Sequence, residues 1–276
     1  MDRKLIFVDI DGTLTRGGSN TPPVSAQKAV RAARKKGHLV YLCTGRNYGM
    51  LLPLLEYGFD GVVGSAGGYI KCREQVIYDC PMTREQQDKA LKVLRKNGIF
   101  CTIEGRDGSY TDDGFKQILA ERAEAEGSSE LLRWQEQIEK ELNIRPMQEY
   151  KGEPIYKIVL MCEREEQFAE PREVLKEDFH FCIQDTNERG FINGELINKK
   201  FDKGRGIERV CSFLGMDVKD TIAFGDSMND VEMIRTAGLG ICMENGNGVL
   251  KELADEICPA VTEDGLSKAF EKHGLI

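Results

Sequence analysis

The sequence has no long hydrophobic run and no excess of positive charge. No apolar stretch approaches the roughly 20 residues that a membrane-spanning helix needs, and residues 1–4 lead into the first apolar segment without the core of a signal peptide. Lysine and arginine number 38 against 46 aspartate and glutamate residues, for a net charge of −8. Nucleic acids and anionic membranes favour a basic surface, so we expect neither as a partner.

Cysteine pairs and histidine clusters are also missing. The nine cysteines are an odd number without a C-x-x-C pair, and several lie in apolar segments, where a free thiol packs as a small hydrophobe. The three histidines are scattered and match no metal-ligand spacing. We therefore expect a reduced, cytoplasmic protein. Its 276 residues, 41% hydrophobic and 30% charged, suit one large globular domain or two ordinary ones.

A short apolar segment, residues 5–8, is rich in β-branched and aromatic side chains and predicts a buried strand. Asp9 and Asp11 follow it, two positions apart, and Gly12 comes next. In extended geometry residues i and i+2 share a face, so the two carboxylates can point to one place. Their repulsion favours a divalent cation, and oxygen ligands suit Mg²⁺. The alternative interpretation is a polar turn after a strand.

The first part of the chain alternates between strands and helices. Strands are expected at residues 5–8, 38–43 and 61–64, with helical segments between them, which is typical of a parallel α/β sheet. We expect Ser25 to cap the first helix and Gly37 to end it. From residue 201 onward the same alternation returns.

The pattern differs between residues 82 and 189. Polar helices and strands are mixed there, with helices expected at 84–96, 115–126, 130–142 and 165–175, and strands at 99–104, 109–111, 155–161 and 179–184. The helices are rich in Glu, Lys and Gln, so one face of each is solvated. We interpret residues 82–189 as an α+β domain inserted into a Rossmann-like parallel-sheet core made of residues 1–81 and 190–276.

Polar residues stand where three of the expected core strands end. They are Asp9 and Asp11, then Thr44-Gly45-Arg46, then Asp226 with Asn229 and Asp230. In an open α/β sheet ligands bind beyond the carboxyl ends of the strands, where backbone amides and helix N-termini suit a phosphate. The Thr44 hydroxyl and the Lys203 ammonium would complete such an anion site. Asp226 would add a third carboxylate for a metal ion.

At these residues the sequence resembles the haloacid dehalogenase-like phosphatases, specifically the Cof-type, subclass IIB hydrolases. The resemblance covers nearly the whole chain and is carried by Asp9-Ile10-Asp11-Gly12-Thr13, Thr44-Gly45-Arg46, Lys203-Gly204, residues 225–233, Ala254-Asp255 and residues 263–266. The most specific part of the resemblance is the segment Asp9-Ile10-Asp11-Gly12-Thr13 followed, later in the chain, by residues 225–233. Two loops depart from the family pattern, which usually has Asn-Gly-Ala at residues 65–68 and Gly-Asn-Ala at residues 244–247.

The resemblance implies an α/β core with an inserted α+β cap and a Mg²⁺-dependent hydrolysis of phosphomonoesters. Asp9 would attack phosphorus to make an aspartyl-phosphate, and Asp11 would protonate the leaving oxygen and then activate water. The Asp9 and Asp226 carboxylates and the Asp11 backbone carbonyl would hold Mg²⁺. Small phosphorylated metabolites, such as sugar phosphates or phosphorylated cofactors, are the expected substrates.

The resemblance also assigns the residues around the phosphate. Thr44, Gly45, Lys203 and Asn229 would hold the transferring phosphoryl group. Supporting roles fall to Asp230, which would orient Lys203 or a water on the metal, and to Arg46, which would contact substrate or only pair with a carboxylate. Lys203 could instead be an ordinary solvated lysine, and Asp230 a helix-start acid. Two rival functions are a phosphomutase or phosphotransferase and a non-catalytic phosphate-binding module; the Asp9 and Asp11 pair disfavours the second.

Overall fold

The computed structural model describes residues 3–17, 19–114, 144–183 and 192–276. The chain divides into two compact units, the first made of Met1–Asp79 and Phe201–Ile276 and the second of Cys80–Lys200. The helices expected at 115–126 and 130–142 lie outside the described residues. No helix in the described ranges has the length and apolar character needed to cross a membrane.

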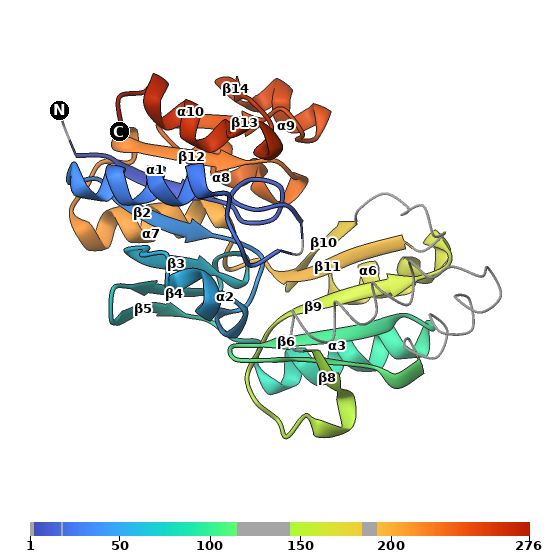
Figure 1. The fold of residues 1–276 in the computed structure, drawn as a ribbon. Helices are drawn as coiled ribbons and strands as arrows, with labels where there is room; N and C mark the ends of the chain where they lie inside the picture. Colours follow the sequence, from blue (N-terminus) through green and yellow to red (C-terminus); the bar gives the residue numbers. More distant parts are fainter. Residues whose placement is uncertain (1–2, 18, 115–143, 184–191) are drawn as a thin grey trace. The chain divides into compact units, whose positions relative to one another are not determined.

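The first unit is built on one mixed sheet whose described strands follow the order β14-β13-β12-β1-β2-β3-β4-β5 (Figure 1). Their bounds are β1 Leu5–Val8, β2 Leu39–Cys43, β3 Gly61–Gly64, β4 Tyr69–Cys72, β5 Gln75–Asp79, β12 Thr221–Gly225, β13 Leu239–Met243 and β14 Glu256–Cys258. Neighbours from β14 to β3 are parallel, and β4 and β5 form an antiparallel edge. The parallel α/β core expected from the alternation is confirmed.

Helices cover both faces of this sheet. They are α1 Val24–Lys35, α2 Tyr48–Leu55, α7 Lys203–Leu214, α8 Val231–Thr236, α9 Gly248–Leu253 and α10 Gly265–Lys272. In β1, Ile6 and Val8 belong to the hydrophobic cluster that includes residues of α1 and α10, whereas Leu5 and Phe7 belong to the cluster of α7 and α8. Both faces of β1 are therefore buried, which explains its continuous apolar sequence.

The start of α1 differs from the expectation. Pro23 is the residue before the helix, with φ −52° and ψ 147°, and its carbonyl accepts the first helical hydrogen bond from Gln27 at 3.0 Å. Ser25 lies inside the first turn and donates to Asp264 at 2.5 Å, so the predicted Ser25 cap is wrong. Gly37 follows the helix end with φ +98°, a conformation that glycine adopts without strain.

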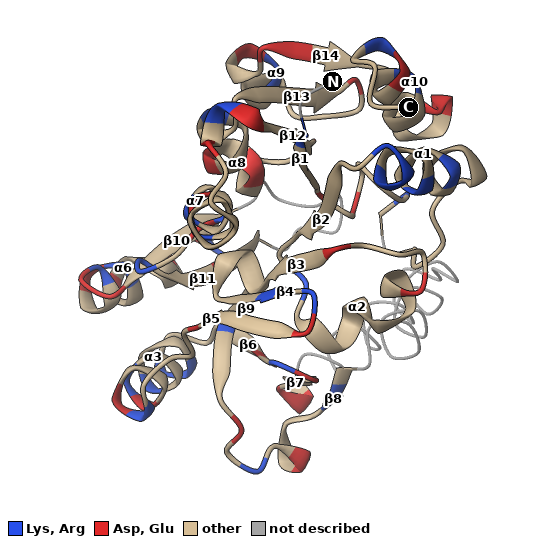
Figure 2. Cartoon of the chain, turned by 90° about the vertical axis from the view of Figure 1, so that its left-hand side faces the viewer, with Lys and Arg blue, Asp and Glu red and all other residues tan. Residues whose placement is uncertain are grey.

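The second unit has its own sheet, with the described strands ordered β10-β11-β9-β6-β7-β8. Their bounds are β6 Phe100–Gly105, β7 Ser109–Thr111, β8 Ile144–Pro146, β9 Ile155–Cys162, β10 Phe179–Ile183 and β11 Ile192–Asn198. Helices α3, Arg84–Lys96, and α6, Ala169–Leu175, contribute to its hydrophobic core. Figure 2 shows charged residues along α3, and Arg84, Asp88 and Arg95 among them are exposed.

The second boundary of the inserted segment differs from the expected one. The sequence pattern predicts the return to the core at residue 190, but β11 pairs antiparallel with both β9 and β10 and belongs to the second unit, which extends to Lys200. The helix expected at 165–175 is also divided, into a 3₁₀ turn, Glu165–Phe168, and α6.

Candidate active site

Three neighbouring parallel strands of the first unit end beside one another. Val8 of β1 lies opposite Leu42 of β2 and Phe224 of β12, so the residues that follow these strands share one edge of the sheet. Asp9 is the first residue after β1 and is only 5% exposed. Thr44 and Asp226 directly follow β2 and β12. The carboxyl ends of the strands thus bring together the polar residues expected there.

Lys203 is the buried cation of this site. It begins α7 and is 1% exposed, which removes the interpretation as a solvated lysine. Its Nζ donates to Asp9 Oδ1 at 2.7 Å, to Asp230 Oδ1 at 2.6 Å and to Asn229 Oδ1 at 3.0 Å. Burial lowers the pKa of Lys203, but the charges of Asp230 and Asp9 outweigh burial and raise it, so the ammonium is charged at neutral pH.

Asp230 uses both carboxylate oxygens within the protein. Oδ1 accepts from Lys203, and Oδ2 accepts from the backbone N–H groups of Asp226 and Ser227, each at 3.0 Å. A Cβ at Gly225 would lie 2.6 Å from the Asp230 Cγ, so glycine permits this close approach. Asp230 is thus in direct contact with the Lys203 ammonium, and its role in orienting Lys203 stays a prediction.

Asp9, Asp226 and Asp230 form a carboxylate cluster whose ligand atoms all lie within 4.8 Å of one another. Burial, followed by the charge of Asp230, raises the pKa of Asp226 to about 6. The same two causes raise the pKa of Asp9 well above its ordinary value, in spite of Lys203. Three carboxylates thus face one ammonium, and this excess of negative hard oxygen donors fits a Mg²⁺ ion. Both carboxylate oxygens of Asp230 already accept hydrogen bonds within the protein. Asp9 and Asp226 are therefore the side chains that would hold the Mg²⁺ ion.

The loop after β1 lies directly against Asp226. Thr13 Oγ1 donates to Asp226 Oδ1 at 2.9 Å. Gly12 has φ +90°, and a Cβ there would lie 2.2 Å from Asp226 Oδ2. Any side chain at position 12 would therefore occupy the place of the carboxylate. This contact explains why glycine follows the two aspartates.

Asp11 pairs with Arg46 and is absent from the carboxylate cluster. Arg46 Nε donates to Asp11 Oδ2 at 2.7 Å and Nη2 to Oδ1 at 2.5 Å, and Nη1 donates to Asn20 at 2.6 Å. The premise that Asp9 and Asp11 point to one place from an extended segment is not met, because β1 ends at Val8 and the chain turns after Asp9. Of the two roles considered for Arg46, this structure has the carboxylate pairing.

The remaining expected phosphate ligands lie at the same strand ends. Thr44 is buried, and its hydroxyl accepts from the Arg46 backbone N–H at 3.2 Å; Gly45 lies between the two residues. Asn229 Oδ1 accepts from Ser227 Oγ at 2.9 Å as well as from Lys203. Contact of these residues with a phosphoryl group stays a prediction, as does the Asp11 backbone carbonyl as a metal ligand.

The loop after β13 also supports the site, which the sequence did not suggest. Asn245 Nδ2 donates to the Gly12 carbonyl at 2.8 Å, and its Oδ1 accepts from the Val261 N–H at 3.0 Å. The Asn247 N–H donates to the Asp226 carbonyl at 2.8 Å. Asn245 and Asn247 lie in residues 244–247, the segment that departs from the family pattern. That departure was the only indication in the sequence that this loop has a particular role.

Comparison with known proteins identifies the family. A sequence model of the haloacid dehalogenase-like hydrolases matches residues 6–270. The chain belongs to this family. The resemblance to this family is therefore confirmed, and curated relatives of similar length have names that include the word phosphatase.

Relatives and solved structures of similar length match nearly the whole chain. YkrA of Bacillus subtilis (strain 168) is 30% identical over 280 residues, covering 100% of both chains. The 5-amino-6-(5-phospho-D-ribitylamino)uracil phosphatase YwtE of the same organism is 27% identical, covering 96% of each. A crystal structure from Geobacillus kaustophilus HTA426 has a TM-score of 0.79 at 26% identity over 100% of both chains. The subclass IIB sugar phosphatase BT4131 has the same fold, with a TM-score of 0.77 at 24% identity over 99% of this chain and 100% of that one.

Proposed function

We propose that this protein is a Mg²⁺-dependent phosphatase that hydrolyses phosphomonoesters of small metabolites through an aspartyl-phosphate on Asp9. The observation that carries the proposal is a buried Asp9 carboxylate held by Lys203 and lying beside Asp226. Sugar phosphates and phosphorylated cofactors are the proposed substrates, which the names of YwtE and BT4131 support. Nine free cysteines support a reducing cytoplasm as its location.

The reaction has two displacements at phosphorus. An Asp9 oxygen attacks the phosphoryl group, the bond from phosphorus to the leaving oxygen breaks, and Asp11 gives that oxygen a proton. A water molecule then attacks the phosphorus of the aspartyl-phosphate while Asp11 takes its proton, which releases inorganic phosphate and restores the Asp9 carboxylate. Lys203 neutralises negative charge on the phosphoryl oxygens, and Thr44, Gly45 and Asn229 position the group.

Mg²⁺ held by Asp9 and Asp226 would neutralise further negative charge on the phosphoryl group. Asp11 needs a change of partner, because both of its oxygens accept from Arg46 in this structure. We propose that Asp11 leaves the guanidinium and takes up a proton from solvent before it protonates the leaving oxygen. After it has taken the proton of the attacking water, it releases that proton to solvent and returns to Arg46 as a carboxylate.

The second unit would act as the cap that selects the leaving group. A phosphomutase or phosphotransferase would use the same aspartyl-phosphate and pass it to a sugar instead of water. The two alternatives differ in product, since only hydrolysis yields one inorganic phosphate for each ester consumed.

The test is phosphate release across a panel of phosphorylated metabolites, with and without chelator, beside Asp9→Asn. We expect Mg²⁺-dependent release in the wild type and none in Asp9→Asn, because an amide is a poor nucleophile. Mass spectrometry of the rapidly quenched wild type should locate phosphate on Asp9. A phosphoenzyme modified at another residue, or full turnover in chelator, contradicts the proposal.

A further inference from the structure

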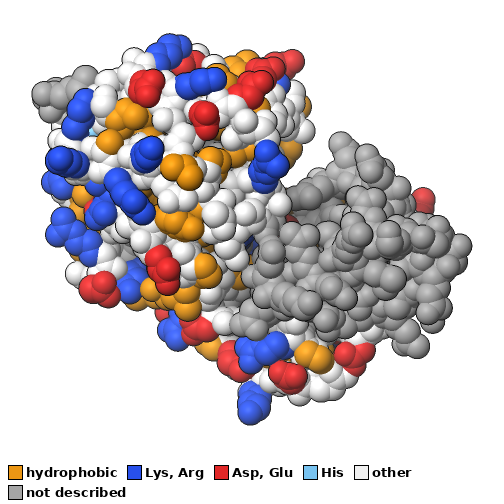
Figure 3. All heavy atoms as spheres, in the orientation of Figure 1, with side chains coloured by type: hydrophobic (Ala, Val, Ile, Leu, Met, Phe, Trp, Pro, Cys, Tyr) orange, Lys and Arg blue, Asp and Glu red, His pale blue; other side chains and the backbone are white. Residues whose placement is uncertain are grey.

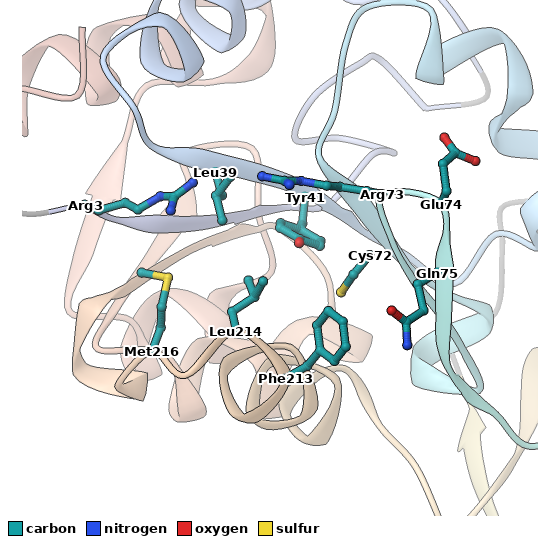
Figure 4. Close-up of a pocket in the computed structure, with 10 residues that line it drawn as sticks. All are labelled: Arg3, Leu39, Tyr41, Cys72, Arg73, Glu74, Gln75, Phe213, Leu214 and Met216. Atoms are coloured by element: carbon teal, nitrogen blue, oxygen red, sulfur yellow. The ribbon is translucent and has the colours of Figure 1, made fainter.

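The first unit contains a cavity of about 490 Å³ away from the carboxylate cluster (Figure 4). It lies at the amino ends of β1 and β2, beside the turn from β4 to β5 and the last residues of α7. The catalytic residues follow the opposite ends of β1 and β2. From Arg3 to Asp9 the chain advances six residues, or about 20 Å at roughly 3.3 Å per residue. The volume is within the range of small-molecule sites.

The interior of this cavity is apolar. Leu39, Tyr41 and Cys72 line it from the sheet, and Phe213, Leu214 and Met216 line it from the end of α7 and the residues after it. Tyr41 is almost fully buried, with its ring centroid 5.6 Å from that of Phe7, so the sheet side is a packed surface. Phe213, by contrast, is 46% exposed. The apolar lining is therefore open to a ligand from the α7 side.

Two arginines stand at the edge of this apolar surface. Figure 4 shows Arg3 and Arg73 extending toward each other with Leu39 between them. Within the described ranges, neither guanidinium makes a hydrogen bond or an ion pair. The neighbouring carboxylate of Glu74 is paired with Lys71 at 3.1 Å. Two guanidinium groups that have no hydrogen-bond or ion-pair partner among the described residues therefore converge at the mouth of the cavity, which favours an anion.

The backbone of Arg73 is in a conformation that favours glycine. Arg73 has φ +52° at the first of the two residues that connect β4 and β5. Its N–H is held by the Asp60 carbonyl at 2.8 Å. For a residue with a Cβ this region costs roughly 1–2 kcal/mol, which glycine avoids. The sequence thus keeps a guanidinium over the cavity at a position where glycine would be less strained, as ligand sites often do.

We propose that this cavity binds a small amphipathic anion, with its apolar or aromatic body against Tyr41 and Phe213 and its phosphate or carboxylate between Arg3 and Arg73. The ligand needs both parts, because the cavity interior offers apolar surface and the two guanidinium groups offer the charge. Since the cavity and Asp9 lie at opposite ends of β1, the site is separate from the phosphate site and does not depend on the proposed reaction.

The test is a fluorescence titration of the full chain with 8-anilinonaphthalene-1-sulfonate, an amphipathic anion, in the presence of chelator to prevent turnover. We expect one saturable site whose affinity falls at least tenfold in the double variant Arg3→Ala with Arg73→Gly. Arg73→Gly alone should weaken binding while melting at the same temperature as the wild type or higher, because it relieves the positive φ. Arg31→Ala, which removes one exposed arginine from α1, is the control that matches the charge change of Arg73→Gly and should bind as the wild type does.

Competition identifies the ligand class. Adenosine 5′-monophosphate, which joins an aromatic body to a phosphate, should displace the probe at concentrations where inorganic phosphate does not. Phe213→Ser should lower the affinity for the probe without changing how that affinity depends on salt concentration. Equal affinity in the double variant, an equal loss in Arg31→Ala, or equal displacement by inorganic phosphate would each overturn the proposal. So would a probe-free dimer that Phe213→Ser dissociates, because the cavity would then belong to a contact between copies.

Discussion

Gly12 is the residue on which the approach of Asp226 to the loop after β1 depends. We predict that Gly12→Ala reduces turnover at least a hundredfold, because the new methyl group would meet Asp226 Oδ2 at 2.2 Å and the φ of +90° would be strained. Gly37→Ala is the matched control, since Gly37 has φ +98° and no atom lies within 4 Å of the place that a Cβ would take there. Both variants should lose roughly 1–2 kcal/mol of stability from backbone strain. Steady-state kinetics and thermal melting separate the two effects, and equal activity in both variants contradicts the contact argument.

Arg46 holds the residue proposed as acid and base. We predict that Arg46→Met lowers kcat roughly tenfold to a hundredfold and changes the pH profile of kcat/KM, because Asp11 loses two charge-assisted hydrogen bonds. Arg34→Met is the control: Arg34 makes a similar two-bond pair with Asp60, at 2.9 and 3.0 Å, outside the site. It should cost stability and leave the pH profile unchanged. A shift of the same size in both variants would remove the special role of Arg46.

The placement of Asp9 and Asp226 at one edge of the sheet was predictable because each follows a recognisable strand. Lys203 was preferred over its neighbours because Gly204 follows it at a helix start, as in the pattern of the family that the sequence resembles. The pairing of Asp11 with Arg46 and of Thr13 with Asp226 was not predictable, since strand periodicity ends at Val8 and the following turn sets the directions of the side chains. The conformation of this turn depends on contacts with residues far away in the sequence, such as Arg46 and Asp226. The local sequence pattern of residues 5–14 contains no information about those contacts.

At the scale of elements, the sheet of the second unit carries a buried charge network. Lys157 of β9 lies 2.6 Å from Glu195 of β11 and 3.3 Å from Glu104 of β6. Burial raises the pKa of Glu104, although Lys157 opposes this effect. A folded-state pKa above the unfolded value means that the carboxyl group's contribution to stability falls as pH rises through the folded pKa. Lys157 limits that loss.

We therefore predict that Lys157→Met destabilises the protein by roughly 3–5 kcal/mol near neutral pH, because it leaves the buried Glu104 and half-buried Glu195 carboxylates without their cation. The loss should be smaller at pH 5 than at pH 8, since Glu104, whose pKa is raised by burial, is protonated to a greater extent at the lower pH. Adding Glu104→Gln and Glu195→Gln should recover part of the stability. Chemical denaturation at the two pH values measures this. A loss independent of pH would indicate that packing, and not charge, is responsible.

Element prediction succeeded where the local signals agreed with the packing. The range of α3 was predicted correctly, and it begins after Thr83, whose side chain accepts from the Gln86 N–H. β11 was missed because Asn193, Gly194 and Glu195 in its middle favour turns or loops. Pairing with β9 on one side and β10 on the other overrides that preference.

At the scale of the whole molecule, the two units each have a sheet and a hydrophobic core of their own. In Figure 3 basic and acidic side chains are interspersed over the visible face of the first unit. We predict that replacing residues 80–200 with a short linker leaves a folded core that binds inorganic phosphate but discriminates less among substrates. Relative kcat/KM values across a panel of phosphorylated metabolites measure the discrimination.

The two different boundaries of the second unit, the one expected from the sequence and the one in the structure, give a second deletion for comparison. Removing residues 82–189 instead would leave β11 without β9 and β10, so its apolar residues Ile192, Leu196 and Ile197 would lose their cover. That shorter deletion should be less soluble than the deletion of 80–200. Unchanged substrate preference in the folded core would show that the second unit does not select the leaving group.

The position of β1 in the middle of the first sheet has a consequence for biosynthesis. One edge of β1 pairs with β2, which is synthesised soon after it. The other edge pairs with β12, which begins at Thr221 and is synthesised much later. At roughly 5–20 residues per second, a ribosome needs about 10–40 s to bridge that interval. During this time an apolar strand has an open edge, and Asp9 and Lys203, 194 positions apart, have not met. Nascent chains stalled before residue 221 should therefore engage chaperones that recognise exposed strands, and release from them should coincide with the emergence of β12.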